Sequence, residues 1–162
     1  MLLPMAEVQV RLATVEDAEV LAHQRSAMFH DMGLLPDGVA EQLRAASIGF
    51  FREALADGSW FGWVASKGDS TVGGAVLHLT TMPPRNGPGG IFIPSRPQGL
   101  IMNVYVEPEH RRCGIAALLM TTALDFARSR DAASVTLHAS QKGKPLYERM
   151  GFAPTHEMRL FL

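Results

Sequence analysis

Six stretches of the chain have the apolar, β-branched or alternating pattern that is typical of β-strands. They are residues 7–12, 60–66, 71–80, 100–106, 134–139 and 157–162. In the first stretch the apolar positions, Leu12 included, alternate with polar neighbours, so we expect them to share a buried face. Residues 67–70 (Lys-Gly-Asp-Ser) form a turn sequence that predicts a hairpin between the second and third stretches. Gly73 and Gly74 predict a bulge or a close backbone approach in the third stretch.

Apolar residues recur at helical spacing in four further segments, residues 14–32, 37–57, 114–130 and 145–150. Thr14, with Asp17 three residues later, matches a variant of the capping box, and Gly33 can end the first helix. Asp37 is the expected N-cap of the second helix. We expect that helix to bury an apolar stripe made of Val39, Leu43, Ala46, Phe50 and Ala54.

Composition is that of a soluble globular protein, and we expect residues 1–162 to form one domain, with 47% hydrophobic and 19% charged residues. A net charge of −1 gives no global electrostatic case for binding nucleic acid. Cys113 is the single cysteine, which excludes an internal disulfide and suits a reducing cytoplasm. Residues 1–5 lack the basic flank of a signal peptide, and no apolar run approaches the roughly 20 residues of a membrane span. We therefore expect a cytoplasmic protein.

The segment between the fourth strand and the third helix carries the clearest chemistry. It has the sequence Arg111-Arg-Cys-Gly-Ile-Ala116 and follows Pro108, which ends the strand because proline cannot donate a backbone hydrogen bond. Amides in the first turn of a helix have no helical partners and lie at the positive end of the helix dipole. Gly114 would let an anion approach these amides, and Arg111 and Arg112 add positive charge. The residues alone leave two interpretations open: a cradle for a pyrophosphate-sized anion, and an ordinary corner with solvated arginines.

The pattern Arg111-x-x-Gly114-x-Ala116, after an apolar strand that ends in Val-Glu-Pro-Glu, resembles the acetyl-CoA-binding signature of the GNAT superfamily of N-acetyltransferases. The resemblance implies an α/β fold whose mixed, mostly antiparallel sheet splits at its central strands and has helices on both faces. It also implies that loop amides hold the pyrophosphate of acetyl-CoA while the strand pairs with the pantetheine arm. The residues assigned to the cofactor are Val104, Tyr105, Val106, Arg111, Arg112, Cys113, Gly114, Ile115, Ala116, Ala117 and Ser140.

Residues 140–152 resemble the second GNAT signature through Leu146-Tyr147-Glu148 and Gly151-Phe152. The resemblance gives Tyr147 the catalytic role of the acid that protonates the departing thiolate, and its usual pKa near 10 lies above that of a thiol. A tyrosine whose ring packs against the core with a wet hydroxyl is the structural alternative. Ser140 stands where the family usually has an asparagine, a departure that concerns only this side chain's contact with CoA.

The first two helices and the segment before the central strand would enclose the amine acceptor, as the resemblance implies. We assign Arg25, Met28, Phe29, Met32 and Asn103 to substrate binding. Methionine and phenylalanine give an adaptable apolar surface. Arg25 could hold a carboxylate, or it could pair at the edge of the core. Residues 82–98, rich in proline and glycine, indicate a long irregular loop that either walls this site or is a disordered insertion.

The general base that must deprotonate the amine is not identified by the sequence. Glu107 and Glu109 flank the pyrophosphate loop and are expected to be solvated. His138 has a suitable pKa, but a lone histidine on a strand is more often structural. We assign no metal ligand.

The function that these residues imply is transfer of an acetyl group from acetyl-CoA to the primary amine of a small molecule, such as an amino acid or its analogue. Two alternatives stay open. One is a non-catalytic sensor that binds acyl-CoA. The other is an acetylase of a protein N-terminus or of aminoacyl-tRNA, and of these two the tRNA acceptor would need a basic face. We expect neither nucleic acid nor membrane as a partner, and the sequence leaves a homodimer open.

Overall fold

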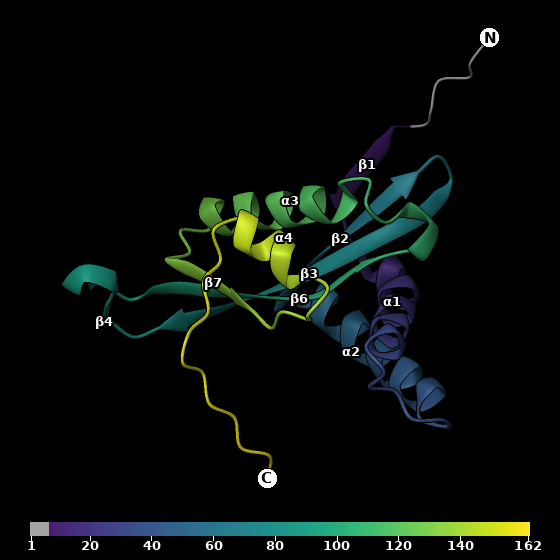
Figure 1. The fold of residues 1–162 in the computed structure, drawn as a ribbon, viewed down its shortest axis with the longest axis horizontal. Coiled ribbons are helices and arrows are strands. Elements are labelled where there is room, and N and C mark those ends of the chain that lie inside the picture. Colours follow the sequence, from purple (N-terminus) through teal and green to yellow (C-terminus); the bar gives the residue numbers. More distant parts are fainter. Residues whose placement is uncertain (1–6) are drawn as a thin grey trace.

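A five-stranded sheet with the strand order β1-β2-β3-β6-β7 runs through the computed structural model, which describes residues 7–162 (Figure 1). Its strands are β1 (Val8–Leu12), β2 (Trp60–Lys67), β3 (Ser70–Met82), β6 (Arg96–Val106) and β7 (Ser134–Leu137). All neighbours pair antiparallel except β6 and β7, which pair parallel. The expectation that residues 1–5 form no signal peptide lies outside the described residues. The mixed, mostly antiparallel sheet confirms the expected fold class.

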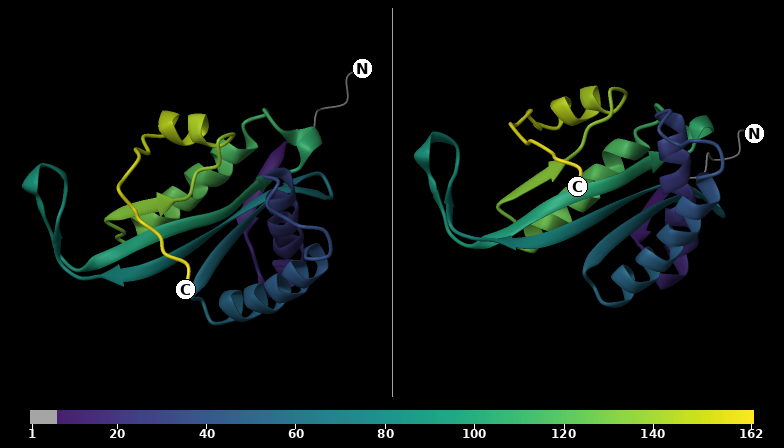
Figure 2. Two further views of the ribbon diagram at one scale, coloured as in Figure 1. Left: turned by 60° about the horizontal axis from the view of Figure 1, so that its bottom comes forward. Right: turned by 90° about the horizontal axis from the view of Figure 1, so that it is seen from below.

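Helices cover both faces of this sheet. Figure 2 shows α1 (Ala18–Asp31) and α2 (Ala40–Ala56) against one face, and α3 (Ile115–Ser129) and α4 (Lys144–Arg149) against the other. Alternate strand residues point to opposite faces. Trp63 therefore joins the cluster under α3, whereas its neighbour Val64 joins the cluster under α1 and α2. No helix within residues 7–162 combines the length and the apolarity that crossing a membrane requires.

The start of the first helix is held by the expected capping box. The backbone amide of Thr14 donates to Asp17 Oδ2 at 2.7 Å, and Arg11 contacts both carboxylate oxygens of Asp17 at 2.8 and 2.9 Å. This confirms the capping prediction, with the refinement that residues 15–17 form a 3₁₀ turn before α1. The prediction that Leu12 is buried was wrong, because Leu12 is 50% exposed. It lies at the end of β1, which is an outer strand of the sheet.

The second helix differs from its prediction in both its start and its buried face. α2 begins at Ala40 without a side-chain cap, so the assignment of Asp37 as its N-cap was wrong. Its fully buried aromatic is Phe51, while Phe50 is 47% exposed. Two adjacent phenylalanines fit the apolar stripe of a helix almost equally well, and packing of α2 against the sheet determines which one is buried.

The predicted bulge at the glycine pair of β3 is confirmed in the pairing with β2, where Gly73 lies opposite Ala65 and Thr71 opposite Ser66, so that Val72 is an extra residue of β3. A second bulge, in β6, lies next to it. The β3–β6 register passes from Gly74 opposite Tyr105 to Val76 opposite Met102, so that one residue of β3 faces two of β6. A Cβ added to Gly74 would collide with the side chain of Gln24 on α1. The backbone of β3 therefore comes close to α1 at this point. The predicted hairpin between β2 and β3 is also present.

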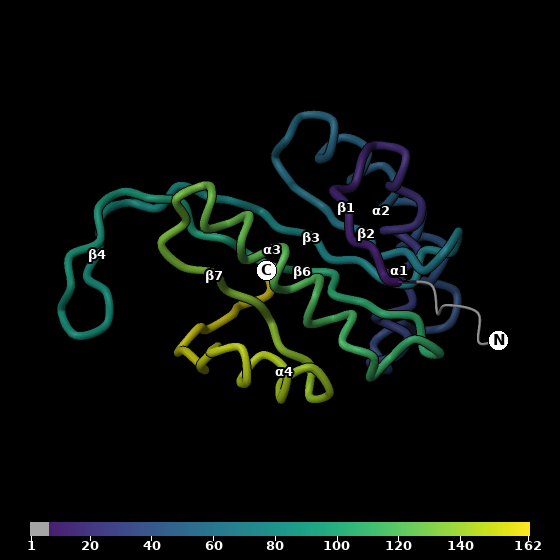
Figure 3. The backbone as a smooth tube through the Cα atoms, turned by 90° about the horizontal axis from the view of Figure 1, so that it is seen from above, coloured from purple at the N-terminus to yellow at the C-terminus, as the bar shows by residue number. Residues whose placement is uncertain are grey.

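The prediction of an irregular loop over residues 82–98 was wrong. β3 extends to Met82 and β6 begins at Arg96, and between them β4 (Arg85–Asn86) pairs with β5 (Phe92–Ile93). The resulting hairpin projects from the domain, at the end opposite to α1 and α2 (Figures 1 and 3). Most of its prolines lie between the paired segments, where the backbone N–H that proline lacks is not needed for a hydrogen bond between strands. They are Pro83, Pro84, Pro88 and Pro94.

The sheet splits between its last two strands, as the family resemblance implies. β7 pairs with β6 only along residues 98–101, and β6 then continues alone on that side to Val106. Beyond Ile101 the edge of β6 that faces β7 is therefore free of strand partners in the described chain.

The last predicted strand, residues 157–162, was wrong. These residues have no regular structure and no strand partner, and the chain runs from α4 past β7 and away from the domain (Figure 1). A segment with an alternating pattern becomes a strand only where it can pair with the edge of a neighbouring strand, and this segment pairs with none in the described structure.

Candidate active site

The corner between β6 and α3 forms a backbone concavity. A 3₁₀ turn at residues 108–110 follows β6, Arg112 has φ of 61°, and Gly114 has φ of 80° directly before α3. The first helical hydrogen bond runs from the Leu118 amide to the Gly114 carbonyl, so the three preceding amides have no helical partner. They belong to Ile115, Ala116 and Ala117. A Cβ on Gly114 would meet nothing within 4 Å, so no other part of the protein covers the outer side of this glycine. This corner fits the pyrophosphate of acetyl-CoA.

The helix behind this corner is fixed by its apolar face. Ile115, Leu119 and Met120 are almost fully buried against the sheet. Burial of such side chains stabilises by roughly 1.5–3 kcal/mol each. The amides at the helix start are therefore held in place before any ligand arrives.

Arg111 turns from the cradle toward the first helix. Its Nε donates to the Val106 carbonyl at 2.8 Å, its guanidinium pairs with Asp31 of α1, and it lies 5.5 Å from the ring centroid of Tyr105. Its neighbours Arg112 and Cys113 are exposed in the loop. The structure thus gives Arg111 protein partners and leaves Arg112 as the exposed cation next to Gly114.

The free part of β6 presents the residues that the sequence assigned to the pantetheine arm. Val104 is half-buried, and Tyr105 and Val106 are buried. The Tyr105 hydroxyl donates to Glu107 Oε2 at 3.2 Å. Burial, together with the negative charge of Glu107, raises the pKa of Tyr105 to about 12. Its hydroxyl therefore stays protonated, and what this strand offers an extended ligand is its backbone edge.

Asn103, which the sequence analysis assigned to the acceptor, lies in the core. It is 2% exposed, has φ of 58°, and its Nδ2 donates to the Leu21 carbonyl of α1 at 3.1 Å. It thereby joins the bulge of β6 to the first turn of α1.

Tyr147 lies on α4, with its ring held between the helix start and the following loop. Ser140 Oγ accepts a hydrogen bond from the Gly143 amide at 3.1 Å, so this hydroxyl is used within the turn that precedes α4. A Cβ on Gly143 would lie 2.8 Å from the Tyr147 ring, and the Phe152 ring packs edge-on at 6.1 Å. Burial raises the pKa of Tyr147 above its usual value. The phenol is therefore a proton donor throughout the neutral range.

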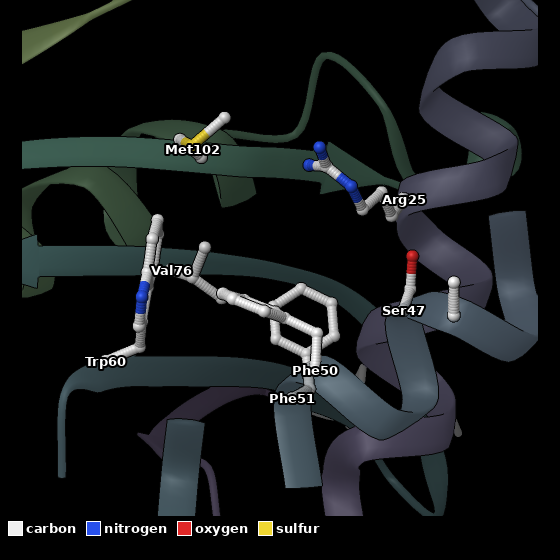
Figure 4. Close-up of a pocket in the computed structure, with 8 residues that line it drawn as sticks. Arg25, Ser47, Phe50, Phe51, Trp60, Val76 and Met102 are labelled. Atoms are coloured by element: carbon white, nitrogen blue, oxygen red, sulfur yellow. The ribbon is translucent and has the colours of Figure 1, made fainter. Parts of the chain in front are cut away.

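A pocket of about 340 Å³ opens on the other face of the sheet (Figure 4). Its lining is apolar and aromatic apart from one arginine and one serine. The lining residues are Arg25, Ala46, Ser47, Phe50, Phe51, Trp60, Val76 and Met102. Figure 4 shows that Arg25 and Met102 lie toward the α1 and β6 side, with Trp60 and Phe50 across from them. The pocket thus draws on α1, α2, β2, β3 and β6.

Of the predicted acceptor residues, the structure brings only Arg25 to this pocket. Phe29 lies beneath the Arg25 guanidinium, 5.1 Å from its ring centroid, while Met28 is half-buried and Met32 is 36% exposed. No residue of the 82–98 segment lines the pocket, so its expected role as a wall was wrong. Partial burial lowers the pKa of Arg25, because the cation loses solvent there.

Sequence analysis missed Trp60, Phe50 and Met102 as pocket residues. Trp60 opens β2 and its ring stacks on His78 at 4.7 Å. Phe50 packs edge-on against Trp60 at 5.4 Å. The one available signal was the pair of adjacent phenylalanines on α2, of which a helix can bury only one fully.

Tyr147 and Arg25 belong to opposite faces of the sheet. α4 shares the α3 face, and the Arg25 pocket lies under α1 and α2 (Figure 2). Between these two faces, β6 runs on past the end of its pairing with β7, from Met102 to Val106, without a strand partner on that side.

None of the candidate bases lines the pocket at Arg25. Glu107 lies near the Tyr105 hydroxyl and 3.5 Å from His23 Nε2, and Glu109 is exposed. His138 contacts Glu157 of the last segment at 3.0 Å. The base stays unassigned among these side chains.

Comparisons with known proteins agree with this geometry. The sequence profile of the acetyltransferase (GNAT) family matches residues 26–152. A GCN5-related N-acetyltransferase from Ralstonia eutropha superimposes with a TM-score of 0.84 at 34% identity, over 96% of this chain and 99% of that one. An acetyltransferase from Clostridium acetobutylicum, solved with acetyl-CoA, gives a TM-score of 0.79 at 25% identity, with 96% of each chain covered.

Curated relatives match over shorter stretches. A probable N-acetyltransferase family 8 member 5 of Mus musculus is 35% identical over 123 residues, which is 74% of this chain and 49% of that protein. Glucosamine 6-phosphate N-acetyltransferase of Trypanosoma brucei brucei is 37% identical over 68 residues, 41% of this chain and 46% of that protein. The chain thus spans less than half the length of these relatives. Fold, cradle and profile agree on acetyl-CoA as the co-substrate, and the chain belongs to the GNAT family of acetyltransferases.

Proposed function

We propose that this protein transfers the acetyl group of acetyl-CoA to the primary amine of a small molecule that carries an apolar body and a carboxylate, such as an amino acid or its analogue. One observation carries the proposal. Arg25 places a partly buried guanidinium in a pocket whose other walls are mainly aromatic and aliphatic. Within residues 7–162, no carboxylate forms an ion pair with it. A cation in such a place is satisfied by an anionic group of the ligand.

The pocket dimensions favour a small acceptor. A volume of about 340 Å³ lies at the lower end of what small-molecule sites offer. Trp60 and Phe50 supply flat apolar walls, and Met102 places the pocket beside β6. An amine held by its carboxylate at Arg25 would therefore lie next to the strand that carries the cofactor.

The rest of the chain supplies the cofactor side. The amides of Ile115, Ala116 and Ala117 bind the pyrophosphate, and the free edge of β6 pairs with the pantetheine arm. Acetyl-CoA supplies an activated acyl group as a thioester. Tyr147 then donates its proton to the departing thiolate, since burial keeps its hydroxyl protonated.

Names of two relatives support a small-molecule acceptor. One is the glucosamine 6-phosphate N-acetyltransferase already described, and the other is streptothricin acetyltransferase of Streptomyces lavendulae, 43% identical over 56 residues. Both are named for acetylation of small molecules. A net charge of −1 continues to argue against an aminoacyl-tRNA acceptor.

A matched substrate screen tests the proposal. Release of free CoA thiol is followed with apolar and aromatic amino acids, with the amines that lack only their carboxylate, and with short peptides. We expect kcat/KM to be about tenfold or more higher for an amino acid than for its decarboxylated partner, because one charge-assisted contact is lost. Equal rates for both members of a pair, or a preference for peptides, would overturn the acceptor class. Binding of acetyl-CoA without transfer to any amine would favour the sensor.

A further inference from the structure

Two aromatic rings form a corner in the pocket at Arg25. Trp60 and Phe50 both line this pocket, their ring centroids lie 5.4 Å apart, and their planes meet at 78°. Phe50 is 47% exposed, whereas its neighbour Phe51 is buried. Aromatic rings pair best when they are stacked with an offset or placed edge to face. A third ring in this corner can stack on one wall and meet the other edge to face, which an aliphatic chain cannot do.

The corner lies across the pocket from its cation. Figure 4 shows Arg25 and Met102 on one side, and Trp60 with Phe50 on the other. An amino acid carries its carboxylate and its side chain on the same carbon atom, pointing in different directions. A carboxylate held at Arg25 would therefore direct the side chain of the acceptor toward the two rings.

His78 supports the Trp60 ring from outside the pocket. The two residues lie opposite each other in the pairing of β2 with β3, and their rings stack with centroids 4.7 Å apart and planes at 22°. Trp60 lines the pocket and His78 does not, so the imidazole covers a part of the indole that an acceptor leaves free. This stack fixes the orientation of the indole, and with it the shape of the corner.

The imidazole is in turn held by the backbone that carries Trp60. His78 Nδ1 lies 2.8 Å from the carbonyl oxygen of Ser59, and because a carbonyl can only accept, Nδ1 is the donor. Ser59 directly precedes Trp60, and its amide donates to Asp57 Oδ1 at 2.8 Å. His78 therefore contacts the same short segment twice, through a hydrogen bond to its backbone and through the stack on its ring.

We propose that the acceptor amine carries an aromatic ring that binds in the corner between Trp60 and Phe50, and that His78 is the positioning residue that fixes this corner. The inference rests on the proposed function, because it names the apolar body of the acceptor whose carboxylate Arg25 is proposed to hold. It gives His78 a role in specificity that the transfer of the acetyl group itself does not require.

A two-by-two set of acceptors tests the class of the ring. The set contains phenylalanine, cyclohexylalanine and the two amines that lack only the carboxylate of these amino acids. Release of CoA thiol should give a kcat/KM about fivefold higher for the planar phenyl member than for the saturated cyclohexyl member, with or without the carboxylate. Equal rates for the two rings, or a preference for cyclohexyl, would overturn the aromatic class.

The same set separates this inference from the proposed function. A comparison at constant ring tests the carboxylate contact of Arg25, and a comparison at constant carboxylate tests the corner. A phenyl preference without a carboxylate preference would support the corner and contradict the proposed role of Arg25. The reverse result would leave the proposed function standing and overturn the inference. Transfer to none of the four acceptors would overturn both.

Variants of His78 test the positioning role. His78→Ala removes the stacked ring and should abolish the phenyl preference while the carboxylate preference stays as in the wild type. His78→Phe keeps a ring beside Trp60 and should restore the phenyl preference. His156→Ala is the matched control, since His156 is exposed in the last segment and does not line the pocket. An equal loss on all four acceptors in His78→Ala, with the phenyl preference unchanged, would show that His78 only stabilises the sheet.

Tryptophan fluorescence gives a readout that does not depend on the acceptor. The chain has two tryptophans, and Trp63 is only 3% exposed, so quenching by acrylamide reports mainly on Trp60. We expect stronger quenching in His78→Ala than in the wild type, and quenching close to that of the wild type in His78→Phe. Unchanged quenching in His78→Ala would show that the imidazole does not hold the indole, and would overturn the positioning role.

Discussion

The corner between β6 and α3 and the pocket at Arg25, which we propose bind the cofactor and the acceptor, are assembled in opposite ways. The corner uses consecutive residues, from the end of β6 through Gly114 to the first turn of α3. The pocket takes its walls from five separate elements, and Trp60 and Met102 come from distant parts of the sequence. A local motif can therefore be read from spacing, whereas a pocket built at long range cannot.

The largest expected effect is at the corner. Gly114→Glu should reduce acetyl-CoA binding below detection in calorimetry, because it places a negative side chain in front of the unpaired amides. Gly33→Glu is the matched control, since Gly33 also has positive φ, at 67°, with open space around it, but lies at the end of α1. Equal affinities in the wild type and Gly114→Glu would show that the corner is not the cradle.

The next effect concerns the acid. Tyr147→Phe should lower kcat by roughly 100-fold and leave acetyl-CoA affinity almost unchanged, which is the loss typical of a missing general acid. Because burial raises the pKa of Tyr147, any loss of activity through its ionisation should occur at a higher pH than the ionisation of an exposed tyrosine. Stopped-flow thiol release across the pH range measures both. A kcat that does not change in the variant would remove Tyr147 from the chemistry.

A smaller effect should come from the acceptor pocket. Arg25→Ala is expected to raise KM for amines with a carboxylate by about tenfold and to leave KM for simple amines near that of the wild type. Arg52→Ala is the control, because Arg52 pairs with Glu19 at 3.1 Å and does not line the pocket. An equal loss on both kinds of amine would show that Arg25 has a structural role. The pocket would then no longer account for recognition of a carboxylate.

The smallest effect tests how α1 is anchored. Hydrogen bonding to Arg11 lowers the pKa of Asp17, so its contribution to stability is present above the unfolded pKa of about 4 and is lost as the pH falls through the lower folded value. Asp17→Asn should lower the free energy of unfolding by about 1 kcal/mol at neutral pH, since a cap and an ion pair are weakened. Urea titrations at several pH values measure it. An unchanged pH dependence in the variant would contradict this assignment.

Sequence reasoning succeeded where a feature depends on interactions between residues that are close along the chain. The capping box at Thr14, the turn after β2 and the glycine at the start of α3 all depend on residues within a few positions. It failed where a partner is far away. Spacing could not tell that Arg111 would meet Asp31, 80 positions earlier, or that Phe51 rather than Phe50 would face the sheet.

By itself, the sequence determined the order of most strands and helices and the strand–loop–helix corner with its open glycine. Periodicity, caps and turns depend on residues close together in the sequence, so they can be recognised without knowing which segment lies opposite. Only the tertiary structure decided that residues 82–98 become a projecting hairpin, that Trp60 and Met102 meet Arg25, and that residues 157–162 have no strand partner. Each of these outcomes depends on which surface lies opposite, and that is a property of the assembled sheet.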